Sequence, residues 1–323
     1  MNPELQGDRA SSAPRAPAVE RLQAGPLVAE VVPEIGGSLA SLYTRAGAGE
    51  PRRDWLRATT DAALQSRSPL ELASFPLVPW CNRIRDGRFE WNGRPVQLAP
   101  NRPDSPHTIH GIGWQRPWRI LERAESWIEL GLVEPGTGAW PFPFTAFQRY
   151  DLDGDGLTVT LSMRNSGSES MPAGLGHHPY FPHRREGAGT SVKAQVGAMW
   201  LSDQEVMPTA LSDAHPAVAA LRVGMRLADF VLDNNFTGLA HEARVSWPDG
   251  SGLRLLGKAP LDHFVLYSPA DKDFFVMEAV SNCTDWINLR RDGKPAAETG
   301  GAVLQPGETL NAQTRWVPKP VRR

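Results

Sequence analysis

The chain has 323 residues, of which 41% are hydrophobic, and a formal net charge of -2. This balance, without basic runs beside aromatic residues, argues against binding to nucleic acid or to an anionic membrane surface. No apolar run approaches the ~20 residues that span a bilayer, and residues 1–18 lack the apolar segment of a signal peptide. Two distant cysteines, Cys81 and Cys283, suit a reducing compartment, although the sequence leaves one disulfide open. We therefore expect a cytoplasmic protein.

The first half of the chain contains several pairs of short strands. Residues 25–33 and 36–42 are interpreted as a strand and its partner, with a glycine pair between them. Residues 118–132 alternate over two runs and are interpreted as another strand pair. Residues 86–98 form a hairpin signature around Asn92-Gly93. The best helical stretch in this part runs from Asp54 to Ser66, although its apolar face is weak.

The second half continues the same pattern. Leu152 to Gly156 superficially resembles a calcium loop, but it lacks the remaining ligands and is interpreted as a turn between two strands. The strands expected in this half cover residues 147–152, 157–163, 191–196, 243–247, 253–256, 264–267, 274–278 and 313–317.

Many short strands separated by glycine and proline turns predict an all-β fold, a large antiparallel β-sandwich with minor helix. Dinucleotide-binding and phosphate-loop signatures are missing from the sequence. We expect a disordered lead over residues 1–20, a single catalytic sandwich domain over residues 21–318 and a short tail over residues 319–323.

The segment Gly174 to Pro182 carries two adjacent histidines. Neighbouring strand residues face opposite sides of a sheet, so only one of His177 and His178 can enter a given pocket. Glu278 ends an apolar strand, where burial would raise its pKa toward the range of a general base. A buried ion pair with an arginine is the alternative for Glu278.

Two further segments have ordinary structural alternatives. Arg83 belongs either to a site or to a surface patch with Arg85 and Arg88. His107 and His110 have a spacing that suits a metal, but no acidic residue or cysteine cluster completes a ligand set, so a structural role is favoured over a metal site.

Taken together in chain order, these segments resemble the aldose 1-epimerase (mutarotase) family from about Gly25 to Trp316. Any one of the matching motifs is weak, but their common order and spacing are specific. Two positions depart from the best-known branch, His177 before the catalytic histidine and Val280 after the catalytic glutamate. The matching segments are Asn82-Arg83-Ile84, Gly87-Arg88-Phe89, Ile109-His110-Gly111, Asn165, His178-Pro179-Tyr180-Phe181, Asp233-Asn234-Asn235-Phe236 and Met277-Glu278.

The resemblance implies a sugar site without metal or cofactor. His178 would be the general acid and Glu278 the general base, facing each other across a cavity with room for a pyranose ring. The sugar hydroxyls would be held by Arg83, His110 and Asp233, with Asn82 nearby, and Trp114 would stack on the sugar. The protein would act on a small-molecule sugar as a monomer or homodimer.

Two alternatives to an aldose 1-epimerase remain. A hexose-6-phosphate 1-epimerase would need a phosphate clamp, for which Arg83, Arg85, Arg88 and Arg116 are the candidates. A non-catalytic carbohydrate-binding protein on the same fold would not need both His178 and Glu278.

Overall fold

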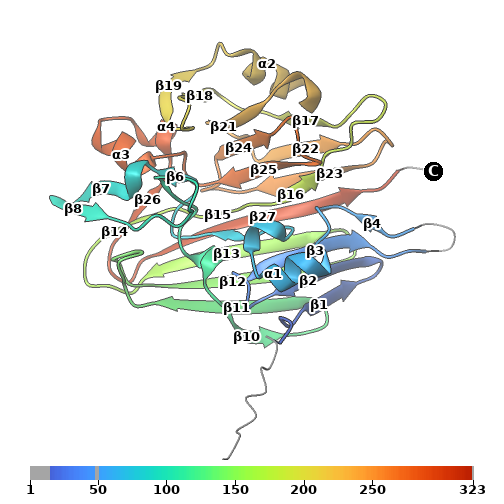
Figure 1. Cartoon of the computed structure of the whole chain (residues 1–323), viewed down its shortest axis with the longest axis horizontal. Coiled ribbons are helices and arrows are strands. Elements are labelled where there is room, and N and C mark those ends of the chain that lie inside the picture. The colour runs from blue at the N-terminus through green and yellow to red at the C-terminus, as the bar shows by residue number, and fades with distance from the viewer. Residues whose placement is uncertain (1–14, 48–50, 322–323) are drawn as a thin grey trace, which may run out of the picture.

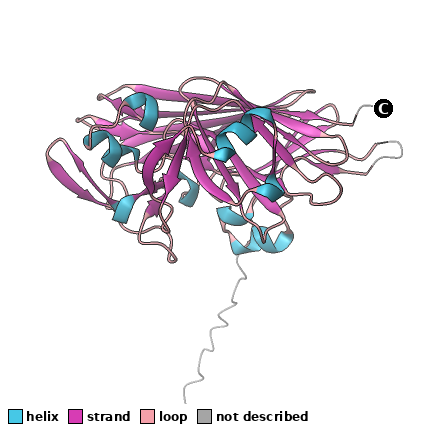
Figure 2. Cartoon of the chain, turned by 90° about the horizontal axis from the view of Figure 1, so that it is seen from above, coloured by secondary structure: helices cyan, strands magenta, loops and turns pink. Residues whose placement is uncertain are grey.

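The computed structural model describes residues 15–47 and 51–321, and strands dominate these ranges (Figures 1 and 2). The α-helices are short, and none in the described part of the chain has the length and apolarity that a membrane crossing requires. They are α1 (Asp61–Ser66), α2 (Pro216–Val223), α3 (Trp286–Arg291) and α4 (Ala296–Thr299). Single 3-10 turns occupy η1 (Pro69–Glu71), η2 (Arg85–Gly87), η3 (Gly113–Gln115) and η4 (Leu227–Asp229).

The largest sheet has nine antiparallel strands and spans the molecule. Next to its central strand β27 lies the hairpin of β12 and β13, on which buried and more exposed side chains alternate, so one face packs on the core. In spatial order its strands are β10 (Arg119–Arg123), β11 (Trp127–Glu134), β12 (Phe144–Leu152), β13 (Leu157–Asn165), β27 (Thr309–Lys319), β23 (Gly252–Gly257), β22 (Glu242–Ser246), β17 (Ser191–Ala194) and β20 (Met225–Arg226).

The second layer is an eight-stranded sheet that carries the residues of interest. Its main path runs through β19 (Pro208–Ser212), β18 (Met199–Ser202), β21 (Leu232–Phe236), β24 (His263–Ser268), β25 (Phe274–Val280), β15 (Gly176–His177) and β5 (Pro76–Leu77), and β16 (Tyr180–Pro182) also pairs with β25.

Smaller sheets complete the sandwich. Four strands form an N-terminal sheet, β1 (Glu20–Ala24), β2 (Leu27–Val32), β3 (Ser38–Thr44) and β4 (Arg53–Asp54). Two-stranded ladders join β6 (Arg83–Ile84) to β9 (Thr108–Ile109), β7 (Arg88–Trp91) to β8 (Arg94–Gln97), and β14 (Met171–Ala173) to β26 (Ala302–Leu304).

Strand β25 is buried on both faces, and its side chains enter two different apolar clusters. Phe275, Met277 and Ala279 enter the main core, which extends from Leu22 to Trp316. Val276 and Val280 join a second, smaller cluster on the opposite face. Glu278 shares that opposite face, since residues two apart on a strand point the same way.

The all-β sandwich predicted from the sequence is confirmed, and so are the strand pairs at residues 25–42, 86–98, 118–132 and 147–163. The helix expected from Asp54 to Ser66 is wrong over its first half. Asp54 pairs in β4, and the helix begins only after Thr60, whose hydroxyl accepts a hydrogen bond from the Ala63 N–H.

The expected chain ends fall partly outside the described residues. Residues 1–14 of the predicted lead and residues 322–323 of the predicted tail are not described. Glu20 already belongs to β1 and Lys319 to β27, so the strands extend one residue beyond each end of the predicted domain.

Candidate active site

A pocket of about 400 Å³ lies on the face of β25 that carries Glu278. Its wall includes all six residues that the sequence singles out: Asn82, Arg83, His110, His178, Asp233 and Glu278. They come from the segments around β6, β9, β15, β21 and β25, which are far apart in the sequence.

Strand register brings the two proposed proton-transfer groups together. Gly176 pairs with Val280 and Tyr180 with Val276, so His178 lies opposite Glu278 between these pairs. His178 Nε2 is 3.4 Å from Glu278 Oε1. The expectation that a pyranose ring fits between the two groups is therefore wrong, because side chains opposite one another on neighbouring strands are in direct reach.

The neighbouring His177 points the other way, into the core between the sheets. Its Nε2 lies 2.9 Å from Gln148 Oε1 on β12, and its ring packs near Tyr150 and Trp316. His178 instead stacks on Phe75, with ring centroids 4.6 Å apart. The two histidines thus divide between core and pocket, as the strand argument predicts.

Burial disfavours charge on both members of the pair. Desolvation raises the pKa of Glu278 well above its usual value; Asp233 adds to this rise, and Arg83 opposes it. Desolvation lowers the pKa of His178 to about 3. Burial therefore favours the state in which both groups are uncharged and the pair holds one proton. Among the described residues, Glu278 Oε2 and His178 Nδ1 are buried without a hydrogen-bond partner.

Arg83 forms the polar wall beside this pair. Its guanidinium donates to Asp233 Oδ2 and to Asn82 Oδ1, each over 3.3 Å. The Asn82 amide oxygen also accepts the Arg83 backbone N–H. Asn82 and Asp233 therefore hold Arg83 in one orientation, with donors and acceptors at the pocket surface.

His110 adds a second donor. Its Nδ1 accepts the Asn82 backbone N–H over 3.2 Å, and burial holds the pKa of His110 well below its usual value. The neutral ring consequently carries its proton on Nε2. His107 faces a different pocket, so the two histidines of this segment do not converge on one ion.

Sequence reasoning missed several pocket residues. Tyr180 follows His178 by two positions on the same face, and Tyr267 lies opposite Asp233 in the β21–β24 ladder. Strand periodicity could have indicated Tyr180. Arg57 lies in the stretch interpreted as helix, and Arg102 lies in a proline-rich loop that offered no signal.

The expected phosphate clamp of four arginines and the expected stacking surface of Trp114 are not assembled around the pocket. Of the four arginines proposed as a phosphate clamp, Arg83 lines the pocket and the other three do not. Arg85 lies near Asp203 and Asp285, Arg88 donates to Gln97, and Arg116 pairs with Glu134. Trp114 is buried beneath Phe75 and donates to the Gly111 carbonyl, so it is not a stacking surface for a ligand. Tyr180, Tyr267 and Phe274 are the aromatic residues that line the pocket.

Comparisons with known proteins show the family and the fold to which the chain is similar. The family model for aldose 1-epimerase matches residues 21–316. The uncharacterized protein YphB of Escherichia coli K12 is 30% identical over 251 residues, which cover 75% of this chain and 82% of YphB. The solved structure of an aldose 1-epimerase candidate from the same bacterium is 26% identical with a TM-score of 0.81, and the match covers 94% of this chain and 99% of that one.

A galactose mutarotase-like protein from Clostridium acetobutylicum shares the fold at 20% identity, with a TM-score of 0.80 over 93% of this chain and 95% of that one.

Proposed function

The chain belongs to the aldose 1-epimerase family, and we propose that it interconverts the α and β anomers of an aldohexose by opening and reclosing the sugar ring. The observation that carries this proposal is the buried His178–Glu278 pair, at 3.4 Å, in the wall of a polar pocket. Such a pair supplies an acid and a base in one place, which anomer exchange requires.

The reaction begins when the pair's proton resides on His178 and Glu278 is a carboxylate. Glu278 then removes the proton from the O1 hydroxyl while His178 donates its proton to the ring oxygen O5. The C1–O5 bond breaks, and C1 becomes the carbonyl carbon of an open-chain aldehyde. After rotation about the C1–C2 bond, the O5 hydroxyl attacks the other face of the carbonyl and both protons return.

The short distance between the two groups suits this chemistry. O1 and O5 are both attached to C1, so the acid and the base must reach two neighbouring oxygens rather than opposite ends of a ring. A sugar seated over the pair, with C1 toward Nε2 and Oε1, satisfies this requirement better than a sugar between them.

The remaining pocket residues would bind the rest of the sugar. Arg83 and His110 present donors, and Asp233 and Asn82 present acceptors, for the other hydroxyls. Tyr180 and Tyr267 offer ring surface to the C–H groups. We further propose that the protein works in the cytoplasm, since Cys81 and Cys283 are both free thiols, which suits a reducing compartment.

Polarimetry of freshly dissolved α-D-glucose and α-D-galactose, with and without the protein, tests this function. We expect the approach to anomeric equilibrium to accelerate in proportion to protein concentration. Binding of sugar without acceleration would favour the carbohydrate-binding alternative, and acceleration restricted to glucose 6-phosphate would favour the phosphate-specific enzyme.

A further inference from the structure

A second pocket of about 330 Å³ opens beside the active-site pocket. The two pockets share part of their wall, because Arg83, Arg102 and Ile109 line both. The two pockets are therefore adjacent, and a ligand that extends from the active-site pocket past these side chains would reach the second one. The far side of this second pocket is formed by residues 204–206, in the turn between β18 and β19.

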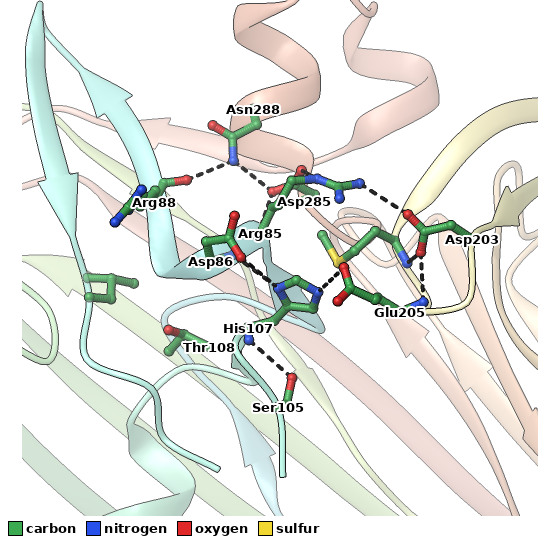
Figure 3. Close-up of polar contacts among 12 residues, drawn as sticks. Arg85, Asp86, Arg88, Ser105, His107, Thr108, Asp203, Glu205, Asp285 and Asn288 are labelled. Atoms are coloured by element: carbon green, nitrogen blue, oxygen red, sulfur yellow. Dashed lines mark hydrogen bonds and ion pairs between the residues drawn. The ribbon is translucent and has the colours of Figure 1, made fainter. Parts of the chain in front are cut away.

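His107 provides a buried donor at the second pocket. Its side chain is nearly fully buried, and its Nδ1 accepts the Asp86 backbone N–H over 3.0 Å, which leaves Nε2 as the ring nitrogen that donates. Within residues 15–47 and 51–321, that Nε2 has no hydrogen-bond partner. Glu205 Oε2 lies 3.6 Å away, and Figure 3 shows the ring between Asp86 and Glu205.

Glu205 can leave this position, because its side chain is 60% exposed at the turn between the strands. A ligand oxygen can then accept the hydrogen bond that His107 Nε2 lacks. An unmade hydrogen bond of a buried donor costs ~1–3 kcal/mol, so satisfying it on binding favours a ligand with hydroxyl groups.

The other groups at this pocket favour a neutral ligand over an anionic one. Ser105 and Gln204 can both donate and accept, and Asp104 and Glu205 present carboxylates. Asp104 already forms two hydrogen bonds with Arg102, which offsets the charge of that guanidinium. A phosphate would face the Glu205 carboxylate, whereas sugar hydroxyls can serve donors and acceptors alike.

We propose that this second pocket is a subsite for the second sugar unit of a reducing disaccharide, whose reducing end is anomerised in the active-site pocket. Its volume is close to that of the active-site pocket, so it suits a second pyranose ring rather than a small substituent. The proposal rests on the proposed function for the reaction, but its binding part can be tested separately.

The experiment compares anomerisation of maltose, cellobiose and lactose with that of glucose, since glucose is the reducing end of all three. We expect at least one disaccharide to have a kcat/KM about tenfold above that of glucose. Gln204→Trp would fill the pocket from an exposed position and raise the KM for that disaccharide about tenfold, leaving glucose kinetics unchanged. Ala210→Trp is the control, an exposed residue of β19 outside the pocket wall.

A second variant tests the buried donor. His107→Asn keeps an acceptor for the Asp86 N–H and removes Nε2, so it should weaken the disaccharide alone. Equal or higher kcat/KM for glucose than for every disaccharide would overturn the proposal.

If no sugar is anomerised, the proposed function fails, and calorimetric titration with the same disaccharides decides the subsite. Binding that Gln204→Trp removes and Ala210→Trp retains would support it; no binding would overturn it.

Discussion

In the pocket, the Arg83 guanidinium donates hydrogen bonds to two oxygen acceptors, one on Asp233 and one on Asn82. We expect Arg83→Ala to raise KM about tenfold or more, because hydrogen bonds to a charged group contribute ~1.5–3 kcal/mol. The effect on kcat should be smaller, since contacts to distant hydroxyls are present in ground and transition states alike. Steady-state anomerisation kinetics measure both constants.

Arg88→Ala is the matched control, because Arg88 belongs to the same basic run but is exposed and bonds Gln97 outside the pocket. Equal KM values for the two variants and the parent would show that Arg83 does not contact the sugar.

His177 is the core histidine, and its burial links stability to acid. Desolvation lowers the pKa of His177 to about 3 in the folded state, against an ordinary value of 6.5. Between these two pKa values the unfolded chain binds a proton at His177 that the folded chain does not bind. The contribution of the neutral His177 to the free energy of unfolding is therefore complete above pH 6.5 and is lost as pH falls toward 3. The slope for one such group is about 1.4 kcal/mol per pH unit.

Urea unfolding at pH 7, 6 and 5 measures this effect. His177→Gln removes the titrating ring, so its unfolding free energy should decline less steeply with acid than that of the parent. Parallel declines would mean that His177 is not responsible.

Among single residues, the sequence indicated the site residues that belong to motifs of recognisable order and spacing. His178 was separated from His177 by strand alternation and family register, and Glu278 stood out as a carboxylate in an apolar strand. The 3.4 Å contact between them was not foreseen, because it depends on pairing between β25 and the segments β15 and β16. Arg102 had no distinguishing neighbour in the sequence.

Among the elements, the turn after β9 sets the position of His110. Gly111 has φ +71°, and a Cβ there would lie 2.0 Å from the Val78 carbonyl oxygen. That oxygen accepts the N–H groups of Ile112 and Gly113, so it cannot easily move. Close approach of two backbones therefore requires glycine at this position.

We expect Gly111→Ala to destabilise the protein more than Gly93→Ala and to reduce anomerisation by displacing His110. Gly93 is the matched control, with φ +73° but no atom of the described residues within 4 Å of an added Cβ, so its substitution adds only the conformational strain of ~1–2 kcal/mol. Urea unfolding compares the two; equal losses would contradict a role for the contact with Val78.

Strands were easier to predict than helices because their period of two is visible over four to nine residues. The Asn92-Gly93 hairpin followed from turn chemistry, and both residues have positive φ. The helix predicted from Asp54 to Ser66 was wrong at its start, because Trp55 and Leu56 pack in the core next to β4. That strand has two residues, which are too few to show a pattern. Tertiary packing decided that segment.

At the scale of the whole molecule, both cysteines lie in the packed interior with 0% exposure. The open question of a disulfide is settled by their being free thiols. Burial also raises the pKa of each thiol well above its usual value, which suppresses the reactive thiolate.

We therefore expect a thiol reagent to modify neither cysteine in the native protein and both in urea. Thiol counting by absorbance checks this outcome. Rapid labelling without urea would indicate that the core around Cys81, whose thiol lies within reach of the Glu278 charge, opens locally.

We propose that His178 and Glu278 share one proton and exchange it with the sugar. The rate should then fall in acid, when the pair gains a second proton and loses its base. It should also fall in alkali, as pH rises through the raised pKa of Glu278 and the pair loses its acid.

The most direct measurement is polarimetric anomerisation by Glu278→Gln, which keeps the shape of the side chain and removes its proton chemistry. We expect a kcat lower by about 10²–10⁴-fold with sugar binding retained, and a change in the same direction for His178→Asn. Near-parent anomerisation by folded Glu278→Gln would contradict it.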